Sequence, residues 1–383
     1  MGFIKVGAAY STLDDSHQAG RNAAEEAVKS SGEPVLTFLF TTDSYNQKIV
    51  FEVVKEVVGK SKIVGFCGGG IIASEAVFRH GVGVCTLSGD GLRVVTSLQK
   101  ELSKDPLDVG RRAGEELLAS GIDKGTVFVL PDGFGTDLSE VIRGLYDSMG
   151  PDFRYVGGGA GDNLKFFKTY QFTEVGIESD ALAVALLDGF IIQTGIGHGW
   201  EPEGEPLVIT DAKGKRVFEI DGRPAFDAYS ERLGEIPKDK FAEYGMRYPL
   251  GFPDISGNYL IRDPLALNSD KSIDFVTEVP RNAVGYIMRC DVADLIETAG
   301  FVAKMAVKKV EEPQFALIFD CISRCVLMGK EFEKELKIIR ESIGMGVPML
   351  GVLTFGEVGS FDDVPLFHNK TIAIAVGGGK KEE

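Results

Sequence analysis

Positive charge is scarce in this sequence. The 383 residues include 41 lysines and arginines against 57 aspartates and glutamates, which gives a formal net charge of −16 at pH 7. Nucleic-acid binding needs clustered lysine and arginine to neutralise phosphates, and no basic stripe is visible. We therefore predict that no nucleic acid is a partner of this chain.

Long apolar runs and a paired set of cysteines are also missing. The most apolar stretch, DALAVALLDGFIIQTGIG, is interrupted by Asp188 and Gly189, so it falls short of a membrane span. The N-terminal residues MGFIKVGAAY have neither the basic start nor the apolar core of a secretory signal. Five cysteines are an odd number in a long chain, which does not suit a disulfide framework. These absences predict a cytoplasmic protein with no membrane partner.

Nucleotide-binding motifs are absent as well. No GxxxxGK[ST] sequence occurs, and GGGAGDN at 157–163 does not match the dinucleotide fingerprint, although it follows an expected strand. Asp162 and Glu357 would repel a phosphate placed against the glycine loops. Glycine also permits tight turns with positive φ, so a structural role for each loop is the competing interpretation.

What the sequence does contain is a threefold repeat. Each copy has an apolar strand, a loop with an acid near its start, an amphipathic helix, a second strand that reaches glycine, a glycine-containing loop and a further strand. The copies begin at Val35, Thr126 and Phe315. Each helix has apolar residues at i, i+3 or i+4 and i+7, which predicts one buried stripe. The expected stripes are Ile49, Val50, Val53, Val54, Val57 and Val58; Leu138, Val141, Ile142, Leu145 and Met149; and Phe332, Leu336, Ile339 and Ile343.

This repeat predicts the fold class. Each copy is a strand–helix–strand unit with an added strand, and the two strands that the helix joins should be parallel. The region between the second and third copies alternates apolar and polar residues between turn signals, as antiparallel strands do. We predict an α/β protein whose repeated units form mixed sheets covered by helices, with an antiparallel β segment in the middle. The glycine loops 65–70, 157–163 and 351–357 should converge on one rim, because they follow equivalent strand ends.

The ordered set of motifs resembles the FIST family. The matching features are IVGFCGGG and YVGGGAGDN in a first module, and VFEIDGRPA, FDCISR, GVLTFGEVGS and FHNKT in a second. The resemblance covers nearly the whole chain and implies a FIST N-terminal domain at 30–218 and a FIST C-terminal domain at 219–376. It also implies a non-enzymatic sensory protein that binds a small ligand, with amino acids or similar metabolites as suggested ligands.

Output and cofactor are further expectations from this resemblance. Without a visible kinase, cyclase, chemoreceptor, helix-turn-helix or F-box segment, the signal should pass in trans to a separate signalling protein. No cofactor is expected, but some family members resemble haem-binding nitric-oxide sensors. Here haem would need His80 or His198 as an axial ligand; a histidine satisfied within a turn is the other interpretation. No metal site is predicted, because Cys321 and Cys325 lack further Cys or His partners.

The main candidate site lies at the strand ends of the third copy. FDCISR and FGE end strands joined by a crossover, and FHN directly precedes the next strand, so Arg324, Glu357, His368 and Asn369 are predicted to converge in one pocket. Arg324 and Asn369 would donate to a ligand carboxylate, and Glu357 would accept from an ammonium. The alternative is an internal ion pair between Arg324 and Glu357, with Asn369 capping a turn.

Four more residues complete the candidate ligand-binding set. Cys321 and Ser323 directly follow the buried strand of the third copy, and Asp162 and Asn163 end the second glycine loop. An enzymatic alternative is a hydrolase with Cys321 as the nucleophile and His368 as its base. Against it stands the interpretation of Cys321 as a small buried hydrophobic residue.

Overall fold

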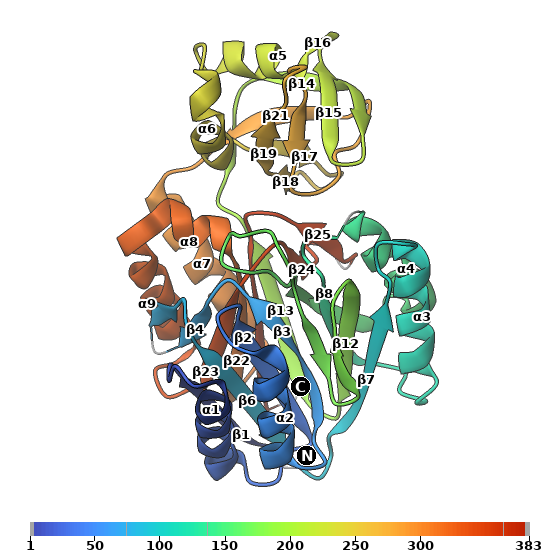
Figure 1. The fold of residues 1–383 in the computed structure, drawn as a ribbon, viewed down its shortest axis with the longest axis vertical. Helices are drawn as coiled ribbons and strands as arrows, with labels where there is room; N and C mark the ends of the chain where they lie inside the picture. Colours follow the sequence, from blue (N-terminus) through green and yellow to red (C-terminus); the bar gives the residue numbers. More distant parts are fainter. Residues whose placement is uncertain (1–3, 74, 136, 363, 380–383) are drawn as a thin grey trace.

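The computed structural model describes residues 4–379 except 74, 136 and 363. These residues form three six-stranded mixed sheets and one eight-stranded antiparallel sheet. The three mixed sheets and their covering helices make the large lower part of the molecule, and the antiparallel sheet makes a smaller unit above it (Figure 1). The predicted fold class is confirmed.

Three units of the same layout build the large part. The first contains β1 (Lys5–Ser11), α1 (Ser16–Ser31), β2 (Leu36–Thr42), α2 (Gln47–Val58), β3 (Lys62–Gly68), β4 (Ile71–Ala73), β5 (Ala76–Phe78) and β6 (Val82–Ser88). The second contains β7 (Arg93–Lys100), α3 (Pro106–Leu118), β8 (Gly125–Pro131), α4 (Leu138–Met149), β9 (Phe153–Gly158), β10 (Gln171–Thr173), β11 (Gly176–Glu178) and β12 (Ala181–Asp188). The third contains β13 (Ile191–Gly197), α7 (Val292–Val307), β22 (Pro313–Cys321), α8 (Ile322–Met328), a 3-10 turn (Gly329–Glu331), α9 (Phe332–Ile343), β23 (Met349–Thr354), β24 (Glu357–Gly359), β25 (Leu366–His368) and β26 (Ile372–Gly378). Each unit thus begins with a strand and a helix that the sequence repeat did not reveal.

The strand order is the same in all three mixed sheets. The orders are β1-β6-β2-β3-β10-β11, β7-β12-β8-β9-β24-β25 and β13-β26-β22-β23-β4-β5. In each sheet the two strands joined by the crossover helix, such as β2 and β3, are parallel, and the other pairs are antiparallel. The parallel pairing predicted for each copy is therefore confirmed.

Each unit lends a short hairpin to a neighbouring sheet. The hairpin β4–β5 pairs with β23, β10–β11 pairs with β3, and β24–β25 pairs with β9. The exchange is cyclic, so it closes the three sheets around a shared apolar core. Phenylalanines from all three units meet in that core, namely Phe38, Phe40, Phe66, Phe128, Phe315 and Phe319. The result is a pseudo-threefold arrangement in which each mixed sheet contains strands from two units.

The glycine loops meet as predicted. The amide of Gly69 donates to the carbonyl of Leu353, Gly161 donates to Cys67, and Gly159 donates to Gly356. Glycine inside the strands has a packing reason: a Cβ on Gly65 would lie 1.8 Å from the carbonyl oxygen of Leu39, and the equivalent Gly157 is 2.0 Å from that of Val129. Because such contacts exclude any side chain, these two glycines are explained without a phosphate.

Two of the three predicted helix stripes are buried in full, those of α4 and α9. The α2 stripe is wrong in part, because Ile49 is 40% exposed while Phe51 is buried. Phe51 is not part of the predicted stripe. Its ring stacks on the ring of Phe172, which belongs to the hairpin β10–β11 of the second unit, at 6.2 Å between ring centroids. A tertiary contact from another unit therefore set the face that α2 buries.

The smaller unit is inserted between β13 and α7 of the third unit. Its elements are β14 (Glu201–Lys213), β15 (Arg216–Ile220), β16 (Arg223–Pro224), α5 (Ala225–Arg232), a 3-10 turn (Lys238–Lys240), α6 (Phe241–Arg247), β17 (Leu250–Pro253), β18 (Tyr259–Arg262), β19 (Pro264–Leu267), β20 (Ile273–Phe275) and β21 (Val284–Arg289). We call it the β unit and the three-sheet part the body. The predicted domain bounds, 30–218 and 219–376, stay a prediction.

Buried polar contacts attach the β unit to the body. Arg262 donates to the carbonyl oxygen of Phe367 at 3.2 Å, and Thr277 donates to Oδ1 of Asn369 at 2.6 Å. The ammonium of Lys370 lies 3.0 Å from a carboxylate oxygen of Asp263, and the Lys370 side chain is fully buried. Most of these contacts reach the turn after β25, so this turn positions the β unit. Among the described helices none is long and apolar enough to cross a membrane.

Candidate functional site

A cleft of about 930 Å³ separates the β unit from the body. The body contributes Gly133, Phe134 and Asp137 from the loop between β8 and α4, Phe166 from the second glycine loop, and Phe355 from the third. The β unit contributes the β14–β15 turn, residues 213–216, and parts of β19 and β20. Figure 1 shows the β unit directly above the body near β24, β25 and α4. The cleft thus lies at the converging strand ends, where parallel sheets commonly bind ligands.

Three aromatic rings form the body side of the cleft. The ring centroids of Phe134 and Phe355 are 5.1 Å apart, those of Phe166 and Phe355 are 5.5 Å apart, and both pairs meet edge to face. Phe134 and Phe166 are 5.4 Å apart. Mutual packing of three rings makes a firm apolar wall.

Charged groups of both signs also line the cleft. Arg216 is neutralised by a two-point ion pair with Asp274, at 2.6 and 2.9 Å. By contrast, Lys215 and Asp137 have no ion pair within the described residues. Burial lowers the pKa of Lys215, while the carboxylates of Glu278 and Asp137 act in the opposite direction. Lys215 and Lys213, which also lines the cleft and has no ion pair in the described residues, offer cations from the β unit, and Asp137 offers an anion from the body.

A narrow slot of about 120 Å³ adjoins the cleft and, like it, lies between the β unit and the body. The two cavities share Phe166, Leu265, Val276 and Phe355. The polar residues of the slot are Asp263, Cys321, Ser323 and Asn369, and the remaining walls are mostly apolar.

Three of the predicted site residues, Cys321, Ser323 and Asn369, line this slot. Sγ of Cys321 lies 3.1 Å from Oγ of Ser323. Burial raises the pKa of the Cys321 thiol to about 12, and the nearby Glu357 acts in the same direction. The thiolate is the nucleophilic form, so Cys321 is a poor nucleophile at neutral pH.

Arg324 does not line the slot with Asn369 as predicted, and the alternative of an ion pair with Glu357 is wrong, because its partners are other carboxylates. Its guanidinium is fully buried on the far side of α8, with Nη2 2.7 Å from Glu335 and Nε 3.2 Å from Asp320. Its other donors reach the backbone oxygens of His198, at 2.7 Å, and Leu295, at 3.1 Å. Two carboxylates and two carbonyls occupy the guanidinium, so Arg324 is a structural clamp between α7, α8 and α9.

Glu357 and His368 lie behind the slot rather than in it. They pair as backbone neighbours of β24 and β25. The carboxylate of Glu357 accepts hydrogen bonds from Thr354 and from the amide and hydroxyl of Thr371. Burial raises the pKa of Glu357 to about 8 and lowers that of His368 to about 3. Nε2 of His368 donates to the carbonyl of Gly359, so among the described contacts it does not serve Cys321 as a base.

Asp162 organises its own loop. One carboxylate oxygen accepts from the amides of Lys165 and Phe166, and the other accepts from Phe167. Asp162 therefore fixes the loop that carries Phe166 into the cleft, instead of facing a ligand itself. Asn163 is exposed and lines neither cavity.

The two histidines considered for haem already contact other groups. His80 is on the surface, where Nδ1 lies 2.7 Å from the hydroxyl of Ser44 and the ring stacks on Tyr45. His198 is half-buried, and its Nδ1 accepts from the amide of Trp200 at 2.9 Å. Burial lowers the pKa of His198 to about 4. Neither residue lines a described cavity wide enough for a macrocycle, and within the described residues no cluster of three His, Cys, Asp or Glu could hold a metal.

Sequence reasoning missed the residues that give the cleft its charge. Lys215 lies in the turn KGKR and Asp137 in the loop DGFGTD, segments far apart in the chain. Asp263 and Lys370 were also missed, although Lys370 is part of the FHNKT motif. The signal in the sequence was Lys370 itself, because a lysine is an unusual residue in a motif whose other members are buried.

Comparison with known proteins places these features in a family. The FIST N domain matches residues 35–223 and the FIST C domain matches residues 225–360. The chain therefore belongs to the FIST family, whose domains are generally sensory or signal-transduction domains.

Its relatives are distant but similar in extent. An uncharacterized protein of Methanocaldococcus jannaschii is 25% identical over 91% of this chain and 74% of its own length. An uncharacterized protein of Mycobacterium tuberculosis is 23% identical over 97% of this chain and 99% of its own length.

Solved structures show weak likeness. A cyanuric acid hydrolase from A. caulinodans is 9% identical, with 49% of this chain and 71% of that chain covered and a TM-score of 0.29. Phosphoribosylformylglycinamidine synthase II from Thermotoga maritima is 10% identical, with 98% and 72% covered and a TM-score of 0.24. Both scores are too low to bear on function.

Proposed function

We propose that this chain is a non-enzymatic sensory protein of the cytoplasm that binds a small zwitterionic ligand in the cleft. Amino acids and similar metabolites have the required pair of charges. The observation that carries the proposal is the pair formed by Lys215 and Asp137, which line one cleft and lack ion-pair partners in the described residues. A ligand carboxylate would accept from Lys215, and a ligand ammonium would donate to Asp137.

The surroundings of this pair suit such a ligand better than a phosphate. Asp137 repels a multiply charged anion, and Arg216 is already neutralised by Asp274. The rings of Phe134, Phe166 and Phe355 exclude water on the body side, which strengthens the charge interactions of a bound ligand.

The site also supports a role in signalling. Asp263 and Asn369 line the slot, and the same two side chains bind Lys370 and Thr277 across the junction between the β unit and the body. A ligand that fills the slot would touch the contacts that set the position of the β unit. A ligand changes a conformational equilibrium only through such state-dependent contacts. We propose that the altered surface of the β unit is then recognised in trans by a separate signalling protein.

The alternatives have less support. A hydrolase would need an activated Cys321, but burial keeps its thiol protonated and His368 binds Gly359 instead. We do not propose a haem, because the ring nitrogens of His80 and His198 contact other groups; a Soret band in protein supplied with haem would revive that alternative.

The test is ligand binding by the wild type and two charge variants, Lys215→Met and Asp137→Asn. A thermal-shift screen of standard amino acids at millimolar concentration should find at least one that raises the melting temperature, because a ligand that binds only the folded state stabilises it. Isothermal calorimetry with the best amino acid should then show roughly 10- to 100-fold weaker binding for each variant, the loss expected for one charge-assisted hydrogen bond.

Matched controls are Lys60→Met and Asp147→Asn, which remove the same charges from exposed positions outside the cleft. They should bind as the wild type does. Equal affinity in all five proteins, or no amino-acid binding at all, would contradict the proposed site.

A further inference from the structure

The slot behind the cleft differs in chemistry from the cleft itself. Its walls are apolar, and they come from three segments of the body and three of the β unit. The wall residues are Leu164, Phe166, Met246, Pro264, Leu265, Val276, Val326 and Phe355. The charged pair Lys215 and Asp137 does not line it.

The polar groups at the floor of the slot already have partners. Oδ1 of Asn369 accepts from Thr277, and its amide nitrogen donates to the carbonyl of His368. The hydroxyl of Ser323 lies against Cys321, and the charge of Asp263 is matched by Lys370 at 3.0 Å. A charged ligand group inside the slot would therefore lose its water without gaining an ion pair, which is strongly unfavourable.

We infer that the slot is a specificity pocket for an uncharged aliphatic or thioether side chain of the ligand. This inference rests on the proposed function, since Lys215 and Asp137 would hold the zwitterionic head at the mouth. At about 120 Å³ beside a cleft of about 930 Å³, the slot has room for one medium side chain and not for the whole ligand. Leucine and methionine match it in size and polarity, whereas glutamate and lysine carry a charge that it cannot satisfy.

The apolar walls set the size of the expected preference. Each methylene group moved from water into an apolar site tightens binding by roughly fourfold in Kd. Leucine should therefore bind at least about tenfold more tightly than glycine, even if burial is incomplete. Glutamate and lysine should bind no more tightly than glycine.

Val326 on α8 provides the test, because it forms a slot wall and is 38% exposed, so a larger side chain can be built there with little disturbance of the core. Calorimetry with glycine, leucine, methionine, phenylalanine, glutamate and lysine would be run on the wild type, on Val326→Trp and on Val326→Ala. Val326→Trp should lower the leucine-to-glycine affinity ratio at least fivefold by filling the slot. Val326→Ala should shift the preference toward phenylalanine by widening it.

Val175→Trp is the matched control, since Val175 is 74% exposed in the β10–β11 turn and lines neither cavity. It should leave the affinity ratio unchanged. If glycine and leucine bind the wild type equally, or if neither Val326 variant changes the preference, the specificity pocket is refuted while the zwitterion site stands. If no amino acid binds and the Lys215 and Asp137 variants change nothing, both proposals fail together.

Discussion

The clamp around Arg324 gives the sharpest test of the fold, through the substitution Arg324→Lys. The guanidinium bridges Glu335 and Asp320 and donates to two backbone carbonyls, and it is completely buried. A lysine ammonium keeps the charge but is a compact point donor, so it cannot span the planar fork that serves all these partners. Burial raises the pKa of Asp320 well above its usual value, and the nearby Glu335 raises it further. Negative charge on both carboxylates of this cluster is therefore already unfavourable.

The expected loss can be worked out from this geometry. Lysine keeps the charge but leaves at least two of the four buried partners without a donor, and each buried group left unsatisfied costs about 1–3 kcal/mol. For a long chain, about 2 °C of melting temperature per kcal/mol gives a decrease of roughly 4–12 °C for Arg324→Lys. Differential scanning calorimetry of the protein without ligand measures this decrease. The ligand-induced rise in melting temperature should persist in the variant, because Arg324 lines neither cavity.

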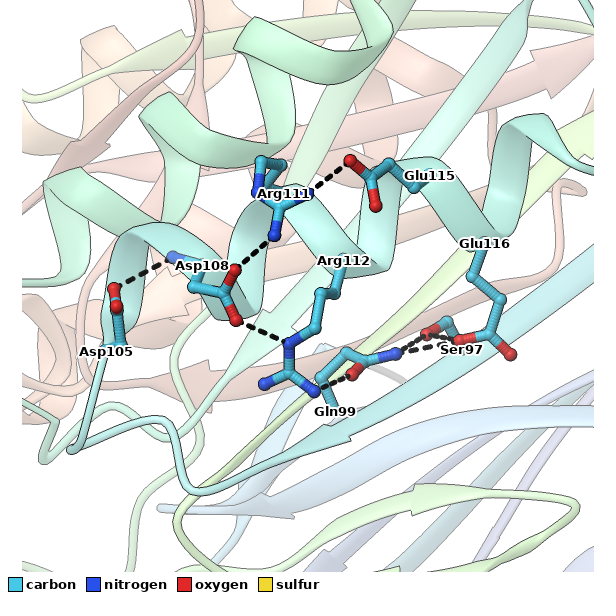
Figure 2. Close-up of polar contacts among 8 residues, drawn as sticks. All are labelled: Ser97, Gln99, Asp105, Asp108, Arg111, Arg112, Glu115 and Glu116. Carbon is cyan, nitrogen blue, oxygen red and sulfur yellow. Dashed lines mark hydrogen bonds and ion pairs between the residues drawn. The ribbon is translucent and has the colours of Figure 1, made fainter.

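Arg111→Lys is the matched control. Arg111 on α3 pairs with Asp108 and Glu115 on the surface (Figure 2). Exposed pairs contribute little because water and salt screen them, so this variant should melt as the wild type does. Equal melting temperatures for Arg324→Lys and Arg111→Lys would refute the clamp. Loss of the ligand-induced rise in Arg324→Lys alone would restore Arg324 as a binding residue.

Three further predictions concern pH, the second glycine loop and nucleic acid. Burial raises the pKa of Glu357 from 4.5 to about 8 in the folded protein. Its contribution to the free energy of unfolding is therefore complete below pH 4.5 and is lost as the pH rises through 8, by up to about 1.4 kcal/mol per pH unit. Glu357→Gln should flatten that decline in melts between pH 5 and 9. Asp162→Ala leaves three loop amides without their acceptor, so limited trypsin digestion should cut after Lys165 or Lys168 much faster than in the wild type; equal rates would contradict the capping role. Fluorescence anisotropy should detect no binding to labelled DNA or RNA at about 0.15 M salt, and binding that persists there would overturn the electrostatic argument.

Local patterns in the sequence were sufficient for the repeat, the crossover strands and the meeting of the glycine loops. The repeat and the crossover strands depend on residues close together in the chain, such as the α4 stripe, and the meeting of the glycine loops follows from their equivalent positions in the three copies. The partner of Arg324 could not be predicted, because Glu335 lies on a different helix and an equally plausible carboxylate, Glu357, follows the neighbouring strand. The exposure of Ile49 also depended on a distant segment, because the hairpin that covers α2 comes from another unit. Contacts between separate elements thus decided what periodicity alone left open.

The candidate site breaks the pseudo-threefold symmetry of the body, because the β unit covers the three corners unequally. The three corners are defined by one equivalent backbone hydrogen bond each, from Thr42 to Gly81, from Asp132 to Ala181 and from Cys321 to Thr371.

At the first two corners, the side chain of the residue that donates this backbone bond contacts other residues of the body. The hydroxyl of Thr42 contacts Ser44 and Gly81, and the carboxylate of Asp132 accepts from the amides of Phe134 and Asp180. At the third corner Cys321 faces the slot, and the adjacent Lys370 reaches out of the body to Asp263. The β unit is inserted into this third unit and covers its corner, and the loop of the second corner that carries Phe134 and Asp137 forms part of the cleft wall beside it. The position of the insertion is therefore what breaks the threefold symmetry: it encloses a cavity against the second and third corners, and under the proposed function a ligand there would contact both the body and the β unit.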